Sequence, residues 1–298
     1  MNPKKVSKLF DNKPSRISIL SPSDTDSNLY RQMQWGDYWV KYELTKALGQ
    51  LGYLVTNDKP NIIIHLFGSH MKLPKNAFKI IWIYSHPEKV DDNLLKRYDK
   101  IFCLSSSFNK KIEEMGFESN ILFGATAKKC FHTPDNSFDY DIFFVGNNRI
   151  DGIRQIVQDI GKTKYNFKVW GTRWENRINS QYIGGQYIDY TNLNEYYAKS
   201  KVSLNDHSDE MRKEGFVAVR IFDILASGGF CISDLNHGID ELFRGTVPQY
   251  ESPTHLKNLI NFYIENDKER QELMLQGREI ASNYTWDKVA KSLISSFL

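Results

Sequence analysis

The sequence predicts an α/β protein made of two doubly wound units in series, each a largely parallel sheet with helices on its faces. Short apolar runs alternate with helical patterns, as is typical of such sheets. The alternation stops once, at a polar segment near the middle of the chain, and then begins again. The chain has 298 residues, enough for two domains of about 140 residues with a core each.

In the first half, six apolar runs have the length and composition of buried strands. They are residues 17–20, 53–56, 62–67, 80–84, 101–104 and 121–123. A helix is expected after Asp37, because Val40, Leu44 and Leu48 keep helical spacing and Gly52 ends the pattern. About 15 residues separate the first strand from this helix, where two to six are usual, and long connections of this kind tend to carry function.

The second half repeats the alternation after the polar, turn-forming residues 132–137, where we expect the linker between domains. The expected strands are 142–145, 167–170, 187–189, 202–204 and 230–233, and the expected helices are 151–160, 193–200, 216–227 and those that follow Ser252. The predicted domains are therefore 1–134 and 135–283, with a final helix over 284–298.

The helix expected over 216–227 has two distinct faces. Val217, Ile221, Ile224 and Leu225 form an apolar stripe, and a separate narrow stripe holds Phe216, Arg220, Asp223 and Ser227. Gly215 is expected to open this helix, and Gly228 with Gly229 to close it. The second stripe is suited to a ligand, although Arg220 and Asp223 would also suit a surface ion pair of about 0.3 kcal/mol.

The composition is that of a globular protein, with 41% hydrophobic and 25% charged residues. A net charge of +3 is too small for a nucleic-acid-binding surface, so no nucleic acid partner is expected. The same charge suits an anionic ligand or an anionic membrane surface, which leaves peripheral membrane association open.

The cysteines and the first residues of the chain indicate the compartment. Cys103, Cys130 and Cys231 are odd in number, and two lie in apolar runs, as buried free thiols do in a reducing environment. No run approaches the roughly 20 apolar residues of a membrane span, and the start of the chain lacks the apolar core of a signal peptide. We therefore expect a cytoplasmic protein.

Several segments, in this order, resemble GT-B glycosyltransferases, most closely the CgeB-like and "glycosyl transferases group 1" branch. The segments are LNDH at 204–207, GF at 215–216, RIFD at 220–223, LASGG at 225–229, WGD at 35–37, IIWIYSHPE at 80–88, YDKIFCLSSSFNKKIEEMG at 98–116, DIFFVGNNR at 141–149, KVWGTRW at 168–174 and YTWDKVAKSLI at 284–294.

This resemblance implies a GT-B fold, in which two Rossmann-like domains face each other across a cleft and the last helix packs back on the first domain. It implies transfer of a sugar from a nucleotide-diphosphate donor to a glycan, lipid-linked or other hydroxyl acceptor, without a metal and with retention. The alternatives are a nucleotide-sugar epimerase or hydrolase of the same shape, and a binding module for sugars or nucleotides without turnover.

The resemblance also implies which residues hold the donor. The diphosphate would lie at the helix start at Gly215, beside Phe216, with bonds from Arg220 and Arg149. Asp223 would accept hydrogen bonds from the ribose hydroxyls. Trp170 and Gly171, together with Trp174, could form the wall of a base pocket, although these residues would equally serve core packing. Arg154, further from its strand, is interpreted as a solvated helix residue.

Four residues are candidates for the chemical step. Asp206 and His207 follow a predicted strand and so reach its carboxyl end, although a capped turn is the alternative. Asp37 is expected to cap its helix and to face the acceptor. His86 follows the strand at 80–84, where an imidazole could transfer a proton near neutral pH, although a structural histidine is the alternative.

Other cofactor and metal signatures fail on spacing. Gly146 follows a strand without the further glycines of a dinucleotide site, and residues 161–163 lack the first glycine of a phosphate-binding loop. Asp24-Thr25-Asp26 and Asp139-Tyr140-Asp141 spell the D-x-D pattern of metal-dependent transferases, but twice and at unsuitable positions. The expectation is therefore a donor substrate with no separate cofactor and no metal.

Overall fold

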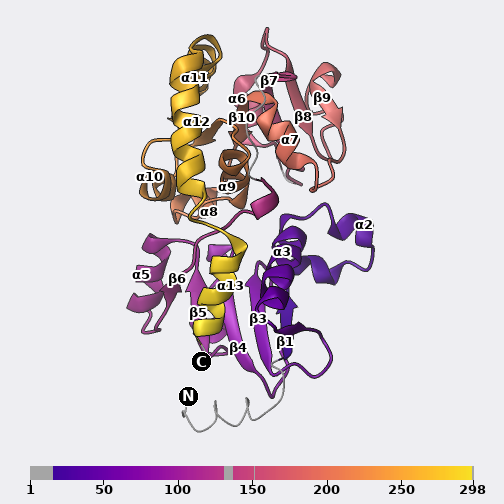
Figure 1. Ribbon diagram of the computed structural model, residues 1–298, viewed down its shortest axis with the longest axis vertical. Helices are drawn as coiled ribbons and strands as arrows, with labels where there is room; N and C mark the ends of the chain where they lie inside the picture. The colour runs from indigo at the N-terminus through magenta and orange to yellow at the C-terminus, as the bar shows by residue number, and fades with distance from the viewer. Residues whose placement is uncertain (1–15, 131–136, 151, 297–298) are drawn as a thin grey trace. The chain divides into compact units, whose positions relative to one another are not determined.

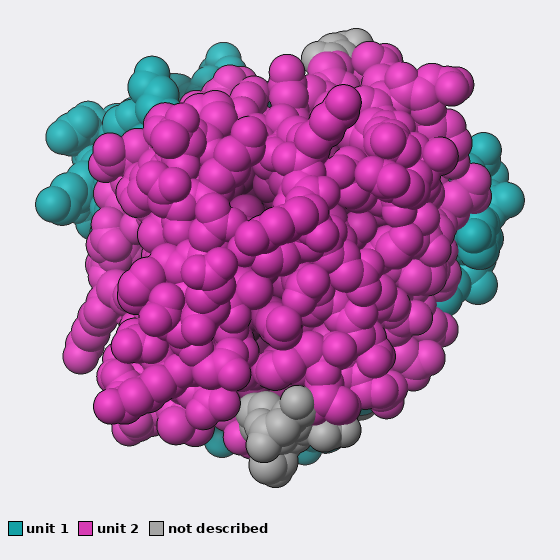
Figure 2. Space-filling model, turned by 90° about the horizontal axis from the view of Figure 1, so that it is seen from above, with its two compact units in different colours: residues 1–123, 213–216, 286–298 teal, residues 124–212, 217–285 magenta. Residues whose placement is uncertain are grey.

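The computed structural model describes residues 16–130, 137–150 and 152–296. The chain forms two compact units, coloured separately in Figure 2. Unit 1 comprises the described residues up to Phe123, residues 213–216 and those from Trp286 onward; unit 2 comprises the described residues of 124–212 and 217–285. The residues predicted as the linker, 132–137, lie almost wholly outside the described residues.

The sheet of unit 1 has six parallel strands in the order β2-β1-β3-β4-β5-β6 (Figure 1). Their bounds are β1 (Arg16–Leu20), β2 (Leu54–Val55), β3 (Ile62–Phe67), β4 (Phe78–Ile83), β5 (Lys100–Cys103) and β6 (Asn120–Ile121). β3 and β4 are apolar except for His65 and Lys79 and are almost wholly buried, as is typical of strands in parallel sheets. All six predicted strands are confirmed, with shifted ends.

The helices of unit 1 are α2 (Leu29–Gln32), α3 (Gly36–Gln50), α4 (Asp92–Leu95), α5 (Ser106–Glu114) and α13 (Trp286–Ser295), with short 3-10 turns η1 (Pro22–Thr25) and η2 (Pro87–Lys89). α13 packs against α3, and the Trp286 ring lies edge-on to Trp82 with centroids 6.4 Å apart. The predicted return of the last helix to the first domain is confirmed.

The sheet of unit 2 is also parallel, in the order β12-β11-β10-β7-β8-β9. Its strands are β7 (Tyr140–Val145), β8 (Phe167–Trp170), β9 (Ile183–Gly185), β10 (Ser200–Asn205), β11 (Cys231–Asp234) and β12 (Gln249–Tyr250). The strand predicted at 187–189 is wrong, because β9 fills that edge. A Cβ added at Gly184 would lie 2.3 Å from Trp170 Nε1, so this edge needs glycine, which gives no apolar strand pattern.

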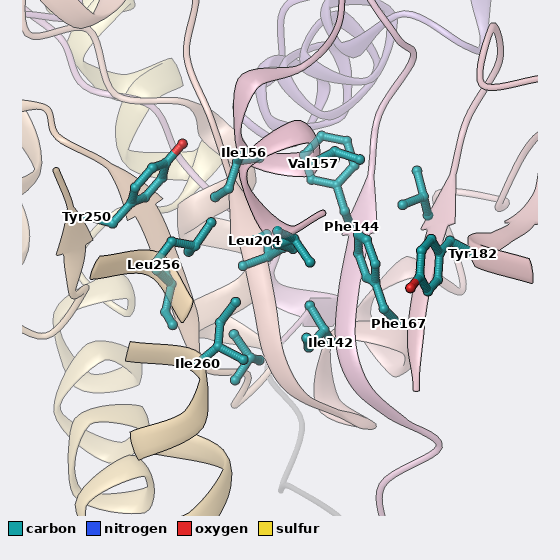
Figure 3. Close-up of a cluster of buried hydrophobic side chains, with 14 of the residues drawn as sticks. Ile142, Phe144, Ile156, Val157, Phe167, Tyr182, Leu204, Tyr250, Leu256 and Ile260 are labelled. Atoms are coloured by element: carbon teal, nitrogen blue, oxygen red, sulfur yellow. The ribbon is translucent and has the colours of Figure 1, made fainter. Parts of the chain in front are cut away.

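Unit 2 contains α6 (Gln155–Ile160), α7 (Leu193–Ala198), α9 (Val219–Ala226), α10 (His237–Phe243), α11 (Pro253–Glu265) and α12 (Asp267–Ala281), and 3-10 turns η3 (Lys128–Cys130) and η4 (Ser180–Tyr182). α8 (Asp209–Lys213) precedes the segment 213–216. Figure 3 shows the core under the sheet, where Phe144 and Leu204 meet Ile156 from α6 and Leu256 and Ile260 from α11. Burial of these apolar side chains is the main stabilising contribution to the unit.

All three cysteines are free and buried, as the sequence predicts. Burial raises the pKa of the Cys103 thiol to about 12, and it raises that of Cys130 equally far. Such thiols pack as small apolar groups rather than reacting.

Candidate functional site

The carboxyl ends of β7 and β10 lie side by side in unit 2, at the point where the strand order reverses. β8 and β9 follow β7 on one side, whereas β10 lies on the other. In open parallel sheets, ligands bind beside the carboxyl ends of the strands at such a point. The candidate site is therefore formed by the residues that follow β7 and β10 and by those on α9, which leads to β11.

Three arginines meet at this point. Arg149 follows β7, Arg154 is the N-cap residue of α6, and Arg220 lies in the first turn of α9. Arg220 lies over the Phe144 ring, 5.3 Å from its centroid, and Arg154 lies 6.0 Å from the same centroid. We call these three residues the arginine cluster.

Asp206 is the carboxylate that the arginine cluster contacts. Its Oδ1 lies 2.9 Å from Arg154 Nη1, and its Oδ2 lies 3.7 Å from Arg149 Nη2. Arg220 instead donates from Nη1 to Asn205 Oδ1 at 3.0 Å, and among the described residues it forms no ion pair. Two guanidinium groups therefore share the buried carboxylate of Asp206, and the third contacts a neutral amide. The cluster is left with an excess of positive charge for an anion to neutralise.

Arg154 is not the solvated helix residue that the sequence predicts. Its Nε donates to the Asn147 carbonyl at 3.0 Å, in addition to the ion pair with Asp206. Burial lowers the pKa of Arg154, and the positive charges of Arg220 and Arg149 act in the same direction while Asp206 opposes them. The guanidinium stays charged, since arginine does not lose its proton in proteins.

Asn148 organises the loop that carries two of the three arginines. Its Oδ1 accepts from the backbone N–H groups of Arg149 at 2.9 Å and Arg154 at 3.1 Å. Its Nδ2 donates to the Arg173 carbonyl at 3.1 Å. The sequence signal that could have marked Asn148 is its place in a GNN turn at the end of a strand.

His207 is buried and has a partner at each ring nitrogen. Nδ1 lies 2.6 Å from Asp234 Oδ1, and Nε2 accepts the Ala218 N–H at 3.0 Å. The side chain is 0% exposed. A ring held in this way cannot reach a substrate, so the predicted catalytic role of His207 is corrected to a structural one in this part of the sheet.

The helix predicted from Gly215 begins instead at Val219. Gly215 has φ +72°, a left-handed conformation that ends α8 and cannot open a helix. The Glu214 carbonyl accepts from Ser107 Oγ at 2.8 Å, and Lys111 Nζ lies 2.5 Å from Glu214 Oε2, so α5 holds this segment within unit 1. The helix start predicted at Gly215 is wrong for this reason, and an anion site at the Gly215 N–H stays a prediction.

Phe216 does not lie on the Arg220 stripe. It is fully buried and packs edge-on against Phe108 of α5, with ring centroids 5.3 Å apart. Both residues belong to unit 1. The predicted contact of Phe216 with the donor is therefore replaced by core packing.

Asp223 and Arg220 do not form the surface ion pair that was the alternative prediction. Asp223 is buried, and its Oδ1 accepts from Thr126 Oγ1 at 2.7 Å. The apolar stripe is confirmed, since Ile221, Ile224 and Leu225 are buried. Asp223 thus contacts the interior of unit 2, and its contact with a ribose stays a prediction.

Trp170 and Gly171 hold two loops together. Trp170 packs against Gly184 and Gly185 and lies edge-on to Tyr196, with centroids 5.6 Å apart. A Cβ on Gly171 would lie 2.3 Å from the Gly146 carbonyl oxygen, so the loops after β7 and β8 are in backbone contact. Trp174 is fully buried and donates from Nε1 to that same carbonyl at 2.9 Å. Packing therefore accounts for what is seen of these residues, and a base pocket stays a prediction.

In unit 1, Asp37 and His86 lie after β1 and β4. Asp37 is the second residue of α3 rather than its cap, which is Trp35, and its Oδ2 accepts the Ser23 N–H at 2.7 Å. It therefore fixes the long connection after β1. His86 is exposed, adopts φ +56°, and lies with Nδ1 2.8 Å from Glu88 Oε1. A non-glycine residue in this conformation is strained, which is common at functional sites.

The D-x-D patterns are engaged in ion pairs. Asp24 Oδ1 lies 2.6 Å from Lys41 Nζ, Asp26 Oδ2 lies 2.9 Å from Arg31 Nε, and Asp141 Oδ1 lies 2.8 Å from Lys201 Nζ. Within residues 16–130, 137–150 and 152–296, no group of three His, Cys, Asp or Glu side chains could hold a metal ion.

Comparison with known proteins gives one family and several related structures. The family described as "Glycosyl transferase-like" matches residues 149–295, about half of the chain and most of unit 2. An uncharacterized glycosyltransferase of Methanocaldococcus jannaschii is 22% identical over 260 residues, covering 80% of this chain and 69% of the relative.

Solved glycosyltransferase structures share the fold over nearly the whole chain. Sucrose-phosphate synthase of Thermosynechococcus elongatus superposes with a TM-score of 0.69 at 11% identity, over 96% of this chain and 98% of that one. The T4 phage β-glucosyltransferase in complex with UDP and Mn²⁺ gives 0.66 at 10% identity, over 95% and 99%. The Anabaena protein HepE in complex with UDP and glucose gives 0.64 at 11% identity, over 95% and 99%.

One further property bears on membranes. Among the described helices, none combines the length and the apolar character that crossing a bilayer requires.

Proposed function

We propose, from the premise that this chain is a GT-B glycosyltransferase, that it transfers a sugar from a nucleoside-diphosphate donor bound by unit 2 to a hydroxyl group of an acceptor. Family and fold both favour this reaction over the epimerase, the hydrolase and the non-catalytic binding module. The narrower resemblance to the CgeB-like branch stays a prediction.

The observation that carries the proposal is the arginine cluster at the carboxyl ends of β7 and β10. Arg149 and Arg154 share the carboxylate of Asp206, and Arg220 contacts the neutral amide of Asn205. A diphosphate supplies the missing negative charge and has oxygens that arginine binds through charge-assisted hydrogen bonds. These bonds strengthen as charge develops on the leaving diphosphate, so the cluster would favour departure of the nucleotide.

In the reaction, the acceptor oxygen forms a bond to the anomeric carbon while the bond from that carbon to the diphosphate breaks. The acceptor proton has to leave in the same process. His86 is the candidate on unit 1 for receiving it, because its ring is exposed and Glu88 orients Nδ1 at 2.8 Å. Asp37 is the second candidate on that unit, although its carboxylate already accepts the Ser23 N–H.

We also propose that the arginine cluster makes a metal unnecessary and that the sugar keeps its anomeric configuration. The first part is supported by the positive charge of the cluster, the second by the family resemblance. The T4 phage enzyme was studied with UDP and Mn²⁺, so the metal requirement needs its own measurement.

A direct test begins with nucleoside diphosphates. One of them should raise the Tm of the protein, since a ligand that binds only the folded state stabilises it. The matching nucleotide sugars are then incubated with hydroxyl acceptors, with and without EDTA, and the anomeric configuration of the product is read by NMR. Failure of every nucleoside diphosphate to bind would refute the proposal, and loss of turnover in EDTA that added metal restores would refute its metal-free form.

A further inference from the structure

His207 contacts both Arg149 and the start of α9, the helix that carries Arg220. The Ala218 N–H can only donate, so His207 Nε2, 3.0 Å away, must be the acceptor and carries no proton. The proton therefore sits on Nδ1, which donates to Asp234 Oδ1 at 2.6 Å. Asp234 Oδ2 also accepts the His207 N–H at 2.9 Å, so the end of β11 fixes both the backbone and the ring of this residue.

One residue is thus tied to two arginines. The His207 carbonyl accepts from Arg149 Nη2 at 2.6 Å. Its ring holds Ala218, the N-cap residue of α9, two positions before Arg220. A shift of His207 would move one guanidinium relative to the other, and a diphosphate needs both at a fixed separation.

We propose that His207 is a positioning residue for the anion site: its neutral ring, held in one tautomer by Asp234, sets the separation of the Arg149 and Arg220 guanidinium groups. This inference rests on the proposed function, because it assumes that these arginines bind a diphosphate. It assigns to His207 a role through other residues and no contact with the substrate.

Two substitutions test the hydrogen bonds of the two His207 ring nitrogens separately. His207→Asn keeps a donor near the position of Nδ1 and loses the acceptor for Ala218, whereas the longer amide of His207→Gln carries an acceptor oxygen toward Ala218. The probe is inorganic pyrophosphate, which contains the diphosphate without a base. By calorimetry, His207→Asn should weaken pyrophosphate binding about tenfold, the effect of a lost hydrogen bond of about 1.4 kcal/mol, and His207→Gln should stay within about threefold of wild type.

Further measurements exclude a merely structural effect. ¹⁵N NMR of the wild-type ring should show a protonated Nδ1 and an unprotonated Nε2. His65 is an equally buried histidine in unit 1, so His65→Gln is the matched control, which should lower Tm and leave pyrophosphate affinity unchanged. If His207→Asn does not fold, Asp234→Asn replaces it. That variant loses the acceptor for the His207 N–H, and about threefold weaker binding is expected.

The outcomes distinguish a failure of the proposed function from a failure of the role of His207. Wild-type protein that does not bind pyrophosphate, or Arg220→Ala that binds it as well as wild type, would overturn the proposed function and this inference with it. If Arg220→Ala abolishes binding while His207→Asn and His207→Gln bind equally, only the role of His207 is overturned. The same holds if His207→Asn lowers Tm alone, or if NMR finds the proton on Nε2.

Discussion

The two sheets carry different chemistry at their carboxyl edges. In unit 2 the edge holds three arginines, of which two share the buried carboxylate of Asp206 and the third contacts Asn205. In unit 1 the connection after β1 pairs its charges one to one, Asp24 with Lys41 and Asp26 with Arg31, and it exposes large rings, with Tyr30 57% and Trp35 46% accessible. Unbalanced charge favours an anion, whereas paired charges with open aromatic faces favour an uncharged partner such as a carbohydrate. The difference supports the proposed binding of the anionic donor by unit 2.

The largest expected effect concerns stability in acid and should arise in unit 1. Burial lowers the pKa of His65 to about 4 from its usual value of 6.5. In the unfolded chain His65 is protonated below pH 6.5, whereas in the folded chain it is protonated only below about pH 4. The free energy of unfolding therefore falls by about 3 kcal/mol as the pH is lowered across this range. Urea denaturation from pH 7 to pH 4 measures the slope, which His65→Gln should reduce. An unchanged slope in that variant would contradict the assignment.

The second effect tests the donor side. Arg220→Ala should weaken binding of a nucleoside diphosphate by about 1.5–3 kcal/mol, the range for hydrogen bonds to charged groups. The plain nucleoside should be affected much less, because the proposed partner of Arg220 is phosphate. Arg31→Ala in unit 1 is the matched control, and calorimetry should show no change in its affinity. Equal losses in the two variants would remove the contrast between the edges.

The third effect contrasts two glycines. Gly171→Ala should destabilise unit 2 by about 1–3 kcal/mol, because φ is +138° and the new Cβ would lie 2.3 Å from the Gly146 carbonyl oxygen. Gly36 is the first residue of α3, and a Cβ added there would have no atom within 4 Å. Gly36→Ala should therefore leave the stability of unit 1 unchanged or raise it slightly. Thermal unfolding of the two variants checks the opposite signs, and a tolerated Gly171→Ala would show that the loops after β7 and β8 can separate.

The smallest effect is expected for an exposed ion pair. Arg31 and Asp26 lie 2.9 Å apart, with the Arg31 side chain 63% exposed. Replacing Arg31 by Ala should leave the free energy of unfolding almost unchanged, since solvent screens such pairs. Denaturant unfolding in low and high salt measures it. A loss of several kcal/mol would mean that the connection after β1 depends on this pair for its conformation.

The strands and the arrangement of the candidate residues could be predicted from sequence because they depend on local signals. Asp206 directly follows β10 and Arg149 lies in the turn after β7, and the carboxyl ends of parallel strands share one edge. Arg154 was missed since its partner Asp206 lies 52 positions away and no local pattern connects them. The helix start was misplaced at Gly215 because contacts with α5, more than 100 positions earlier, hold residues 213–216.

For His207 the sequence predicts the position but not the role. Its position after β10 was predicted correctly, but Asp234, 27 positions later, decides which nitrogen carries the proton, and Ala218 occupies the other. A strand end supplies candidates for chemistry and for capping alike. Only the tertiary partners distinguish the two roles.

The path of the chain through unit 1 has a consequence for biosynthesis. β1 begins the unit, yet α13, whose Val289, Ala290, Leu293 and Ile294 are buried, comes after all of unit 2. A ribosome releases the chain from its amino end, so the face of α3 that receives α13 is exposed to solvent while unit 2 is made. The unit that contains the first strand is thus completed only after unit 2 has been synthesised.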